Sequence, residues 1–295
     1  MDKVVPDQAE GLRRLLSHSG ARVIAVTGGS PRAGCSTTVV NLAAALAGQG
    51  KDVLVIDEQP GVGSVSATLG VGGGGGGAGG AENFAALARG EMSFERAVAR
   101  HPLGFAVLAA SRANRERCTS AQFAALLAGP ADVVLIDAQL DRNGALSALA
   151  MHAHDVLIVT RVAAQAITDA YACMKRLHYE HAIAQFRVLV NHVQSVTDAR
   201  TAFENLAGVA GRYLSVALEA AGCIAADARI VRALELSRCV VDAFPSTPAA
   251  RGYRYLAAEL QYWPMRPAMS SRAPWMAGAT VTAAQHADQP SAQHA

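Results

Sequence analysis

The sequence has few features that would place the protein in a membrane, outside the cell or on nucleic acid. None of its apolar runs approaches the roughly 18 residues of a membrane-spanning helix, so we expect no such helix. The first residues contain no apolar segment typical of a secretion signal. The formal net charge of +2 is too small to indicate a nucleic-acid partner. The five cysteines form no C-x-x-C pair, which favours reduced thiols in a cytoplasmic protein.

The remaining composition is that of an α/β protein. A chain of 295 residues with 51% hydrophobic residues can bury a large core. Apolar β-branched runs predict strands, and helical patterns separate them. The predicted strands are 23–27, 52–57, 105–110, 132–137, 155–160, 186–191 and a short one near 222–225. The predicted helices are 36–48, 83–89, 93–100, 119–128, 143–151, 165–181 and 197–214. This alternation predicts a mostly parallel sheet with helices on both faces.

The ends of the chain differ from this central domain, which we place at residues 21–263. Residues 1–20 predict a separate short helix with an apolar face formed by Leu12, Leu15 and Leu16. A glycine-rich loop at 72–80 and a tail at 264–295 have the composition of disordered segments. A helix over 249–262 closes the domain, and the sequence leaves open whether it packs on the domain or lies on a membrane surface.

The most informative segment is the loop that follows the first predicted strand. A phosphate-binding loop of the Walker type reads G-x-x-x-x-G-K-[ST], and Gly29, Gly34 and Ser36 have that spacing. Backbone N–H groups and the helix N-terminus would cradle the phosphates of a nucleotide there. The lysine position, however, is occupied by Cys35. The segment therefore predicts a nucleotide site that has lost part of its charge.

Polar residues end several of the predicted strands. Asp57, Asp137 and Asn191 each follow an apolar run, and ligands of parallel sheets bind at the carboxyl ends of the strands. Ser36 and Asp137 are the residue types that hold Mg²⁺ in a phosphate-binding loop fold, the hydroxyl directly and the carboxylate through water. The convergence of these residues on one edge predicts a Mg²⁺–nucleotide site.

A family resemblance follows from longer motifs. The segments VTGGSPRAGCSTTVVNLAAALA, VLVIDEQPGVGSVSATLG and VVLIDA resemble the loop, the switch and the second Walker strand of the MinD/ParA-type P-loop ATPases. The segment DQAEGLRRLL at 7–16 resembles the D-Q-A-x-x-L-R element that the FlhG/FleN flagellar regulators carry ahead of that domain. The chain is therefore identified as a member of the FlhG/FleN group.

The resemblance implies roles for residues of both regions. The N-terminal element, with Asp7, Gln8, Leu12, Arg13 and Leu16, would contact the flagellar signal-recognition-type GTPase FlhF and stimulate its hydrolysis of GTP. ATP or ADP with Mg²⁺ would bind in the central domain, at residues matching the family's loop, switch and base-recognition positions, which are Gly29, Gly34, Cys35, Ser36, Thr37, Asp57, Asp137, Asn191 and Asp227. Among these, Asn191 would recognise the adenine base, and Asp227 would lie in the base-binding turn.

Several departures from the family pattern weaken ATP chemistry. The lysine that reaches across a dimer falls on Ser30, and the catalytic aspartate falls on Gln59. Two loop glycines are replaced by Pro31, which has no N–H, and by Arg32. Since a hydrogen bond to a charged group is worth about 1.5–3 kcal/mol, losing both lysines weakens phosphate binding by roughly 10²–10⁴-fold. We therefore expect weak or absent hydrolysis.

Two other functions stay open at this stage. The protein would be an active MinD-type ATPase that dimerises on ATP at the inner membrane and acts on basal-body or transcription-activator proteins, or it would be a ParA-like partition protein. Cys35, at a predicted helix N-terminus near Arg32, would be a low-pKa redox thiol or a small filler residue. Arg112, Arg115 and Arg117 read as a solvated basic loop.

Overall fold

A computed structural model describes residues 20–59, 61, 63–70 and 79–271. The predicted partner-binding helix, most of the glycine-rich loop and the tail from 272 lie outside these residues. In the described part of the chain, no helix combines the length and the apolar character needed to cross a membrane.

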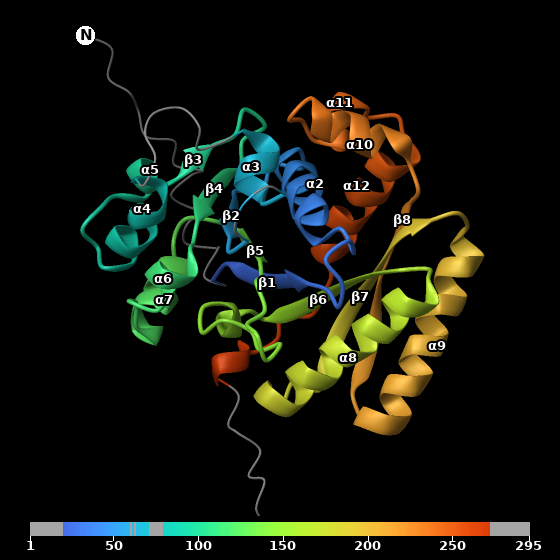
Figure 1. The fold of residues 1–295 in the computed structure, drawn as a ribbon. Coiled ribbons are helices and arrows are strands. Elements are labelled where there is room, and N and C mark those ends of the chain that lie inside the picture. The colour runs from blue at the N-terminus through green and yellow to red at the C-terminus, as the bar shows by residue number, and fades with distance from the viewer. Residues whose placement is uncertain (1–19, 60, 62, 71–78, 272–295) are drawn as a thin grey trace, which may run out of the picture.

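An eight-stranded sheet forms the centre of the structure, in the order β3-β4-β2-β5-β1-β6-β7-β8 (Figure 1). All neighbouring pairs are parallel except β3 with β4. The strands are β1 Arg22–Thr27, β2 Val53–Asp57, β3 Ala99–Arg100, β4 Ala106–Ala109, β5 Val133–Asp137, β6 Asp155–Arg161, β7 Gln185–Val193 and β8 Ala217–Ala225. The predicted mostly parallel sheet is thus confirmed.

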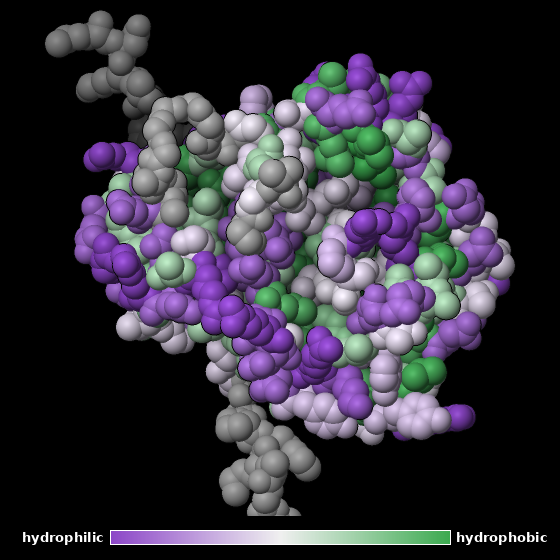
Figure 2. Space-filling model, in the orientation of Figure 1, coloured by the Kyte–Doolittle hydropathy of each residue, from purple (hydrophilic) through white to green (hydrophobic). Residues whose placement is uncertain are grey.

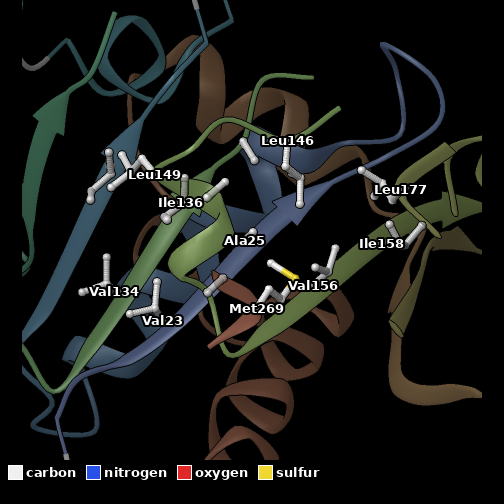
Figure 3. Packing of buried hydrophobic residues seen from close by; sticks show 14 of the residues in the cluster. Val23, Ala25, Val134, Ile136, Leu146, Leu149, Val156, Ile158, Leu177 and Met269 are labelled. Carbon is white, nitrogen blue, oxygen red and sulfur yellow. The ribbon is translucent and has the colours of Figure 1, made fainter. Parts of the chain in front are cut away.

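Helices cover both faces of the sheet (Figure 1). They are α2 Cys35–Ala47, α3 Val65–Leu69, α4 Gly79–Ala88, α5 Phe94–Ala97, α6 Arg112–Arg115, α7 Ser120–Leu127, α8 Ala164–His181, α9 Val196–Leu214, α10 Ala228–Glu235, α11 Val240–Ala243 and α12 Pro248–Leu260. Side chains alternate across each strand, so Val23 and Ala25 face one core, which Figure 3 shows with Met269, and Ile24 and Val26 face the other.

Some predicted elements differ from the structure. Residues 143–151 do not form an α-helix, because Gly144 has a φ of 82° and the Asp141 carboxylate accepts the N–H groups of Asn143 and Ala145 to make a loop. The predicted helix at 93–100 is limited to α5, and β3 follows it. The sequence patterns did not reveal α3, α6, α10 and α11, most of which are too short to show a helical period.

The structure corrects one boundary of each segment that was predicted to be disordered. Gly79 and Gly80, assigned to the glycine-rich loop, start α4 instead. The tail does not begin at 264, since residues 264–271 lie on the domain, with Met269 buried in the core. The preceding helix α12 packs through Tyr253, Leu256 and Leu260 against the core that contains α2. Of the two alternatives for this helix, the structure shows the one in which it packs on the domain.

A few large apolar side chains remain at the surface. Figure 2 shows apolar residues gathered over α10 and α11 at one end of the domain. Val231 and Leu236, which are 60% and 45% exposed, lie in and just after α10. The burial of α10 is accordingly confined to a narrow face around Ala233.

An ion-pair cluster around Asp155 joins the amino ends of the strands to the segment after α12. The Asp155 carboxylate, fully buried, lies 3.2 Å from Arg22 and 3.0 Å from both Arg187 and Arg266. The Arg187 guanidinium also stacks on the Trp263 ring, 3.9 Å from its centroid. Arg266 is thereby held at the amino edge of the sheet, although the sequence composition places it in the predicted disordered tail.

Removing this carboxylate should destabilise the protein strongly. Because Asp155→Ala leaves the buried Arg22 without an anionic partner, and Arg187 and Arg266 with Glu219 alone, we expect the free energy of unfolding to fall by about 3–5 kcal/mol. Chemical denaturation measures this loss. Glu116→Ala removes the partner of Arg112 in an exposed pair and serves as the control, with a midpoint almost unchanged. Equal midpoints for the two variants would contradict the assigned role.

Candidate nucleotide-binding site

The loop between β1 and α2 leaves the first turn of that helix open to an anion. Gly34 is the N-cap of α2, with a left-handed φ of 96°, and no side chain caps the helix. The N–H groups of the first turn, which includes Ser36 and Thr37, lack intrahelical acceptors. Such a helix start attracts a phosphate through its dipole and its N–H groups.

The two predicted loop glycines are required by close packing. A Cβ at Gly29 would collide with the backbone of Asp169 in α8, and one at Gly34 would collide with the Asn191 side chain. The loop is therefore pressed between α8 and the end of β7. By contrast, Pro31 and Arg32 are exposed, and Arg32 makes no ion pair with any described residue.

Asp137 has the most unusual environment of the site. It ends β5, is completely buried, and neither carboxylate oxygen has a hydrogen bond of standard geometry. Burial raises its pKa to about 7; the nearby Ser36 hydroxyl opposes this shift, and the charges of Asp57 and Glu58 add smaller upward effects. An unpaired buried carboxylate is costly unless it serves a ligand. Ser36 and Asp137 thus lie together, as the Mg²⁺ prediction requires.

Asp57 and Gln59 are occupied by contacts within the protein. The Asp57 carboxylate accepts the Gln59 N–H and both the N–H and the hydroxyl of Ser66. The Gln59 amide donates to the carbonyl of Ala138, 3.0 Å away. Asp57 therefore fixes the loop after β2, and its carboxylate oxygens already have donors.

The predicted adenine-site residues also have protein partners. The Asn191 side chain donates to the Ala33 carbonyl at 2.9 Å and so supports the phosphate-binding loop from β7. Asp227 caps α10 by accepting the N–H of Arg229. Asn191 lies near the carboxyl end of β7, and Asp227 follows the carboxyl end of β8, which places both at the same edge of the sheet.

The thiol of Cys35 does not have the low pKa that a helix N-terminus predicts. Burial raises its pKa above the ordinary value, and the neighbouring Asp137 and Cys173 add to that effect. A thiol in this state is a poor nucleophile. The filler interpretation of Cys35 therefore fits the structure, and the redox interpretation does not.

A buried ion pair beside Asp57 was missed by the sequence patterns. Arg115, expected in a solvated loop, is buried and lies 3.3 Å from the Glu58 carboxylate. Burial raises the pKa of Glu58, while Arg115 and the Ser147 hydroxyl oppose the shift. Only the position of Glu58 directly after a strand-ending aspartate pointed to this pair, because its partner is distant in sequence.

Two cavities lie at this edge of the sheet. One of about 360 Å³ is lined by Asp57, Gln59 and Ser66, and one of about 410 Å³ is lined by Arg115, Asp141 and Ser147. Arg112 and Gln139 line both. The cavities therefore border the loops that follow β2, β4 and β5.

Comparison with known proteins gives one curated relative and several solved structures. No protein-family model matches the chain. The antiactivator FleN of Pseudomonas aeruginosa is 29% identical over 262 residues, which cover 86% of this chain and 91% of FleN.

The solved structures share the fold at lower identity. MinD in the Aquifex aeolicus MinC:MinD complex superposes with a TM-score of 0.64 and 21% identity, covering 83% of this chain and 97% of that one. A ParA family ATPase of Chlorobium tepidum gives 0.62 and 15%, covering 82% and 99%. Pyrococcus horikoshii MinD, solved with Mg-ADP, gives 0.59 and 19%, covering 81% and 96%. The chain is therefore similar to FleN over most of its length and has the P-loop fold of the MinD/ParA ATPases.

Proposed function

We propose that the protein regulates the number or placement of bacterial flagella by binding an FlhF-type GTPase and stimulating its GTP hydrolysis. The observation that carries the proposal is the similarity to FleN over most of the chain, together with the segment 7–16 that the FlhG/FleN group carries. Gln8 would orient the attacking water at the GTP site of the partner, as glutamine does in other GTPases. Leu12 and Leu16 would anchor the segment, and Asp7 and Arg13 would complete the contact.

The central domain would act as a degenerate nucleotide module in the cytoplasm. The uncapped start of α2 and the unpaired Asp137 fit a Mg²⁺–phosphate group, with Ser36 and Asp137 as the residues that hold the ion. Mg²⁺ would neutralise phosphate charge there. Cys35 and Ser30 supply no positive charge, so we propose weakened binding of ATP or ADP and little hydrolysis.

Further partners follow from what the relatives are called. FleN is named an antiactivator, which favours a transcription-activator protein as a second partner. The alternative function is an ATP-driven switch, and the retained Asp137 carboxylate favours it. Mg²⁺-dependent ATP turnover that is lost in Asp137→Ala would support this switch over the degenerate module.

The GTPase proposal predicts a specific loss of stimulation. With purified FlhF-type GTPase, Gln8→Ala should reduce stimulated GTP hydrolysis at least tenfold, and deletion of residues 1–20 should abolish it, because the water-orienting amide is removed. Phosphate release under multiple turnover measures both. Gln194→Ala, an exposed glutamine in the folded domain, is the matched control and should keep full stimulation. Stimulation that survives both changes would exclude the mechanism.

A second prediction concerns the pH dependence of stability. The folded pKa of Asp137, about 7, exceeds that of an unfolded aspartate, so the folded state loses stability as pH rises from about 4 through 7. Asp137→Asn should therefore raise the free energy of unfolding at pH 8 by about 2–4 kcal/mol, as measured by chemical denaturation. This gain should fade toward pH 4.

The matched control for this measurement is Asp141, whose contribution to stability has the opposite pH dependence. N–H groups of Ala145 and Asn143 lower the pKa of Asp141, so its contribution is present at neutral pH and is lost as the pH falls through the lowered pKa. Asp141→Asn should accordingly lower stability at pH 8 and approach the unmodified protein in acid. A gain for Asp137→Asn that does not change with pH would contradict the environment assigned to Asp137.

A further inference from the structure

The loops that follow β2 and β5 are joined to each other by direct hydrogen bonds. The Glu58 N–H donates to the Asp137 carbonyl at 3.2 Å, which continues the pairing of the two strands. Beyond the strands, the Gln59 side chain donates to the Ala138 carbonyl at 3.0 Å, and the Gln139 N–H donates to the Glu58 carboxylate at 3.0 Å. Side chains of one loop therefore hold the backbone of the other.

The second oxygen of Glu58 extends this contact along the loop after β5. The Ser147 hydroxyl donates to it at 2.6 Å, and the Arg115 guanidinium lies 3.3 Å away. Glu58 and Arg115 are both buried, so this ion pair is shielded from solvent. One carboxylate thus joins residue 139 to residue 147, which lies within the segment 143–151 that does not form the expected helix.

The Asp57 carboxylate, at the end of β2, is hydrogen-bonded to the start of α3. It accepts the Gln59 N–H at 3.2 Å and the Ser66 N–H at 2.8 Å. The start of α3 is therefore fixed to the end of β2. With Glu58 and Gln59 fixed across to the other loop, every residue from 57 to 59 makes a hydrogen bond outside the regular strand pattern.

The glutamine at 59 is the residue that makes the crossing bond to Ala138 available. A carboxylate at this position has no N–H to donate to the Ala138 carbonyl. It would also add negative charge beside Asp57, Glu58 and Asp137. The charge of Asp57 already helps to raise the pKa of Glu58, and the charges of Asp57 and Glu58 help to raise the pKa of Asp137. The replacement of the family's aspartate by Gln59 therefore removes a charge and adds a bond.

We propose that Gln59 and Glu58 form a clamp that holds the loops after β2 and β5 in one arrangement in the nucleotide-free protein. The surface formed by these loops, with the cavities of about 360 and 410 Å³, then does not depend on a bound phosphate for its shape. This goes beyond the proposed GTPase regulation, because it assigns to this chain a fixed surface where loops would otherwise be ordered by ligand.

Amide hydrogen exchange of the purified, nucleotide-free protein tests the clamp. Gln59→Glu keeps the size of the side chain and removes the donor, and Gln59→Met removes the donor without adding charge. Gln194→Glu is the matched control, since it adds the same charge at an exposed glutamine outside the two loops. The segments compared are 58–66 and 138–147, with β6 and β7 as the internal reference.

Both Gln59 variants should exchange about five- to tenfold faster in the two segments together, as expected for the loss of one hydrogen bond that couples them. Gln194→Glu should exchange as the unmodified protein does. Acceleration confined to 58–66, or none in Gln59→Met, would overturn the clamp. No partner GTPase enters the measurement, so this result is independent of the proposed function.

Discussion

The unpaired carboxylate of Asp137 is the constraint around which the site is built. It lies buried at the end of a central strand, beside the uncapped start of α2, and nothing in the described residues neutralises it. Its cost in folding stability has to be met by the two cores that the parallel sheet holds on its faces. We propose that this group serves a cation bound together with an anion, although the family's lysine positions are occupied by Ser30 and Cys35.

The two edges of the sheet carry different kinds of charged cluster. At the amino edge, Asp155 is saturated by guanidinium groups and joins the C-terminal segment to β1 and β7. At the carboxyl edge, Glu58 is paired, Asp57 is hydrogen-bonded, and Asp137 has no hydrogen bond of standard geometry to any described residue. The first cluster stabilises the fold, whereas the second leaves one group free for a ligand.

Much of this arrangement could be predicted from local sequence. The strand-ending Asp57, Asp137 and Asn191 meet at one edge because parallel strands place their carboxyl ends there, and the glycine spacing located the loop. The Glu58–Arg115 pair and the Asp155–Arg266 contact join residues far apart in the chain, and no periodicity reports such pairs. The raised pKa of Cys35 also depends on burial by tertiary packing, which outweighs the helix terminus.

We propose that the loop between β1 and α2 keeps the architecture of a phosphate-binding loop and binds nucleotides only weakly. Calorimetric titration of the purified protein with ATP and with ADP, in the presence and absence of Mg²⁺, tests it most directly. We expect dissociation constants of about a millimolar or weaker, because two charged contacts to the phosphates are lost. Micromolar binding that requires Mg²⁺ would contradict it, and would mean that Arg32 and the loop backbone replace the missing lysines.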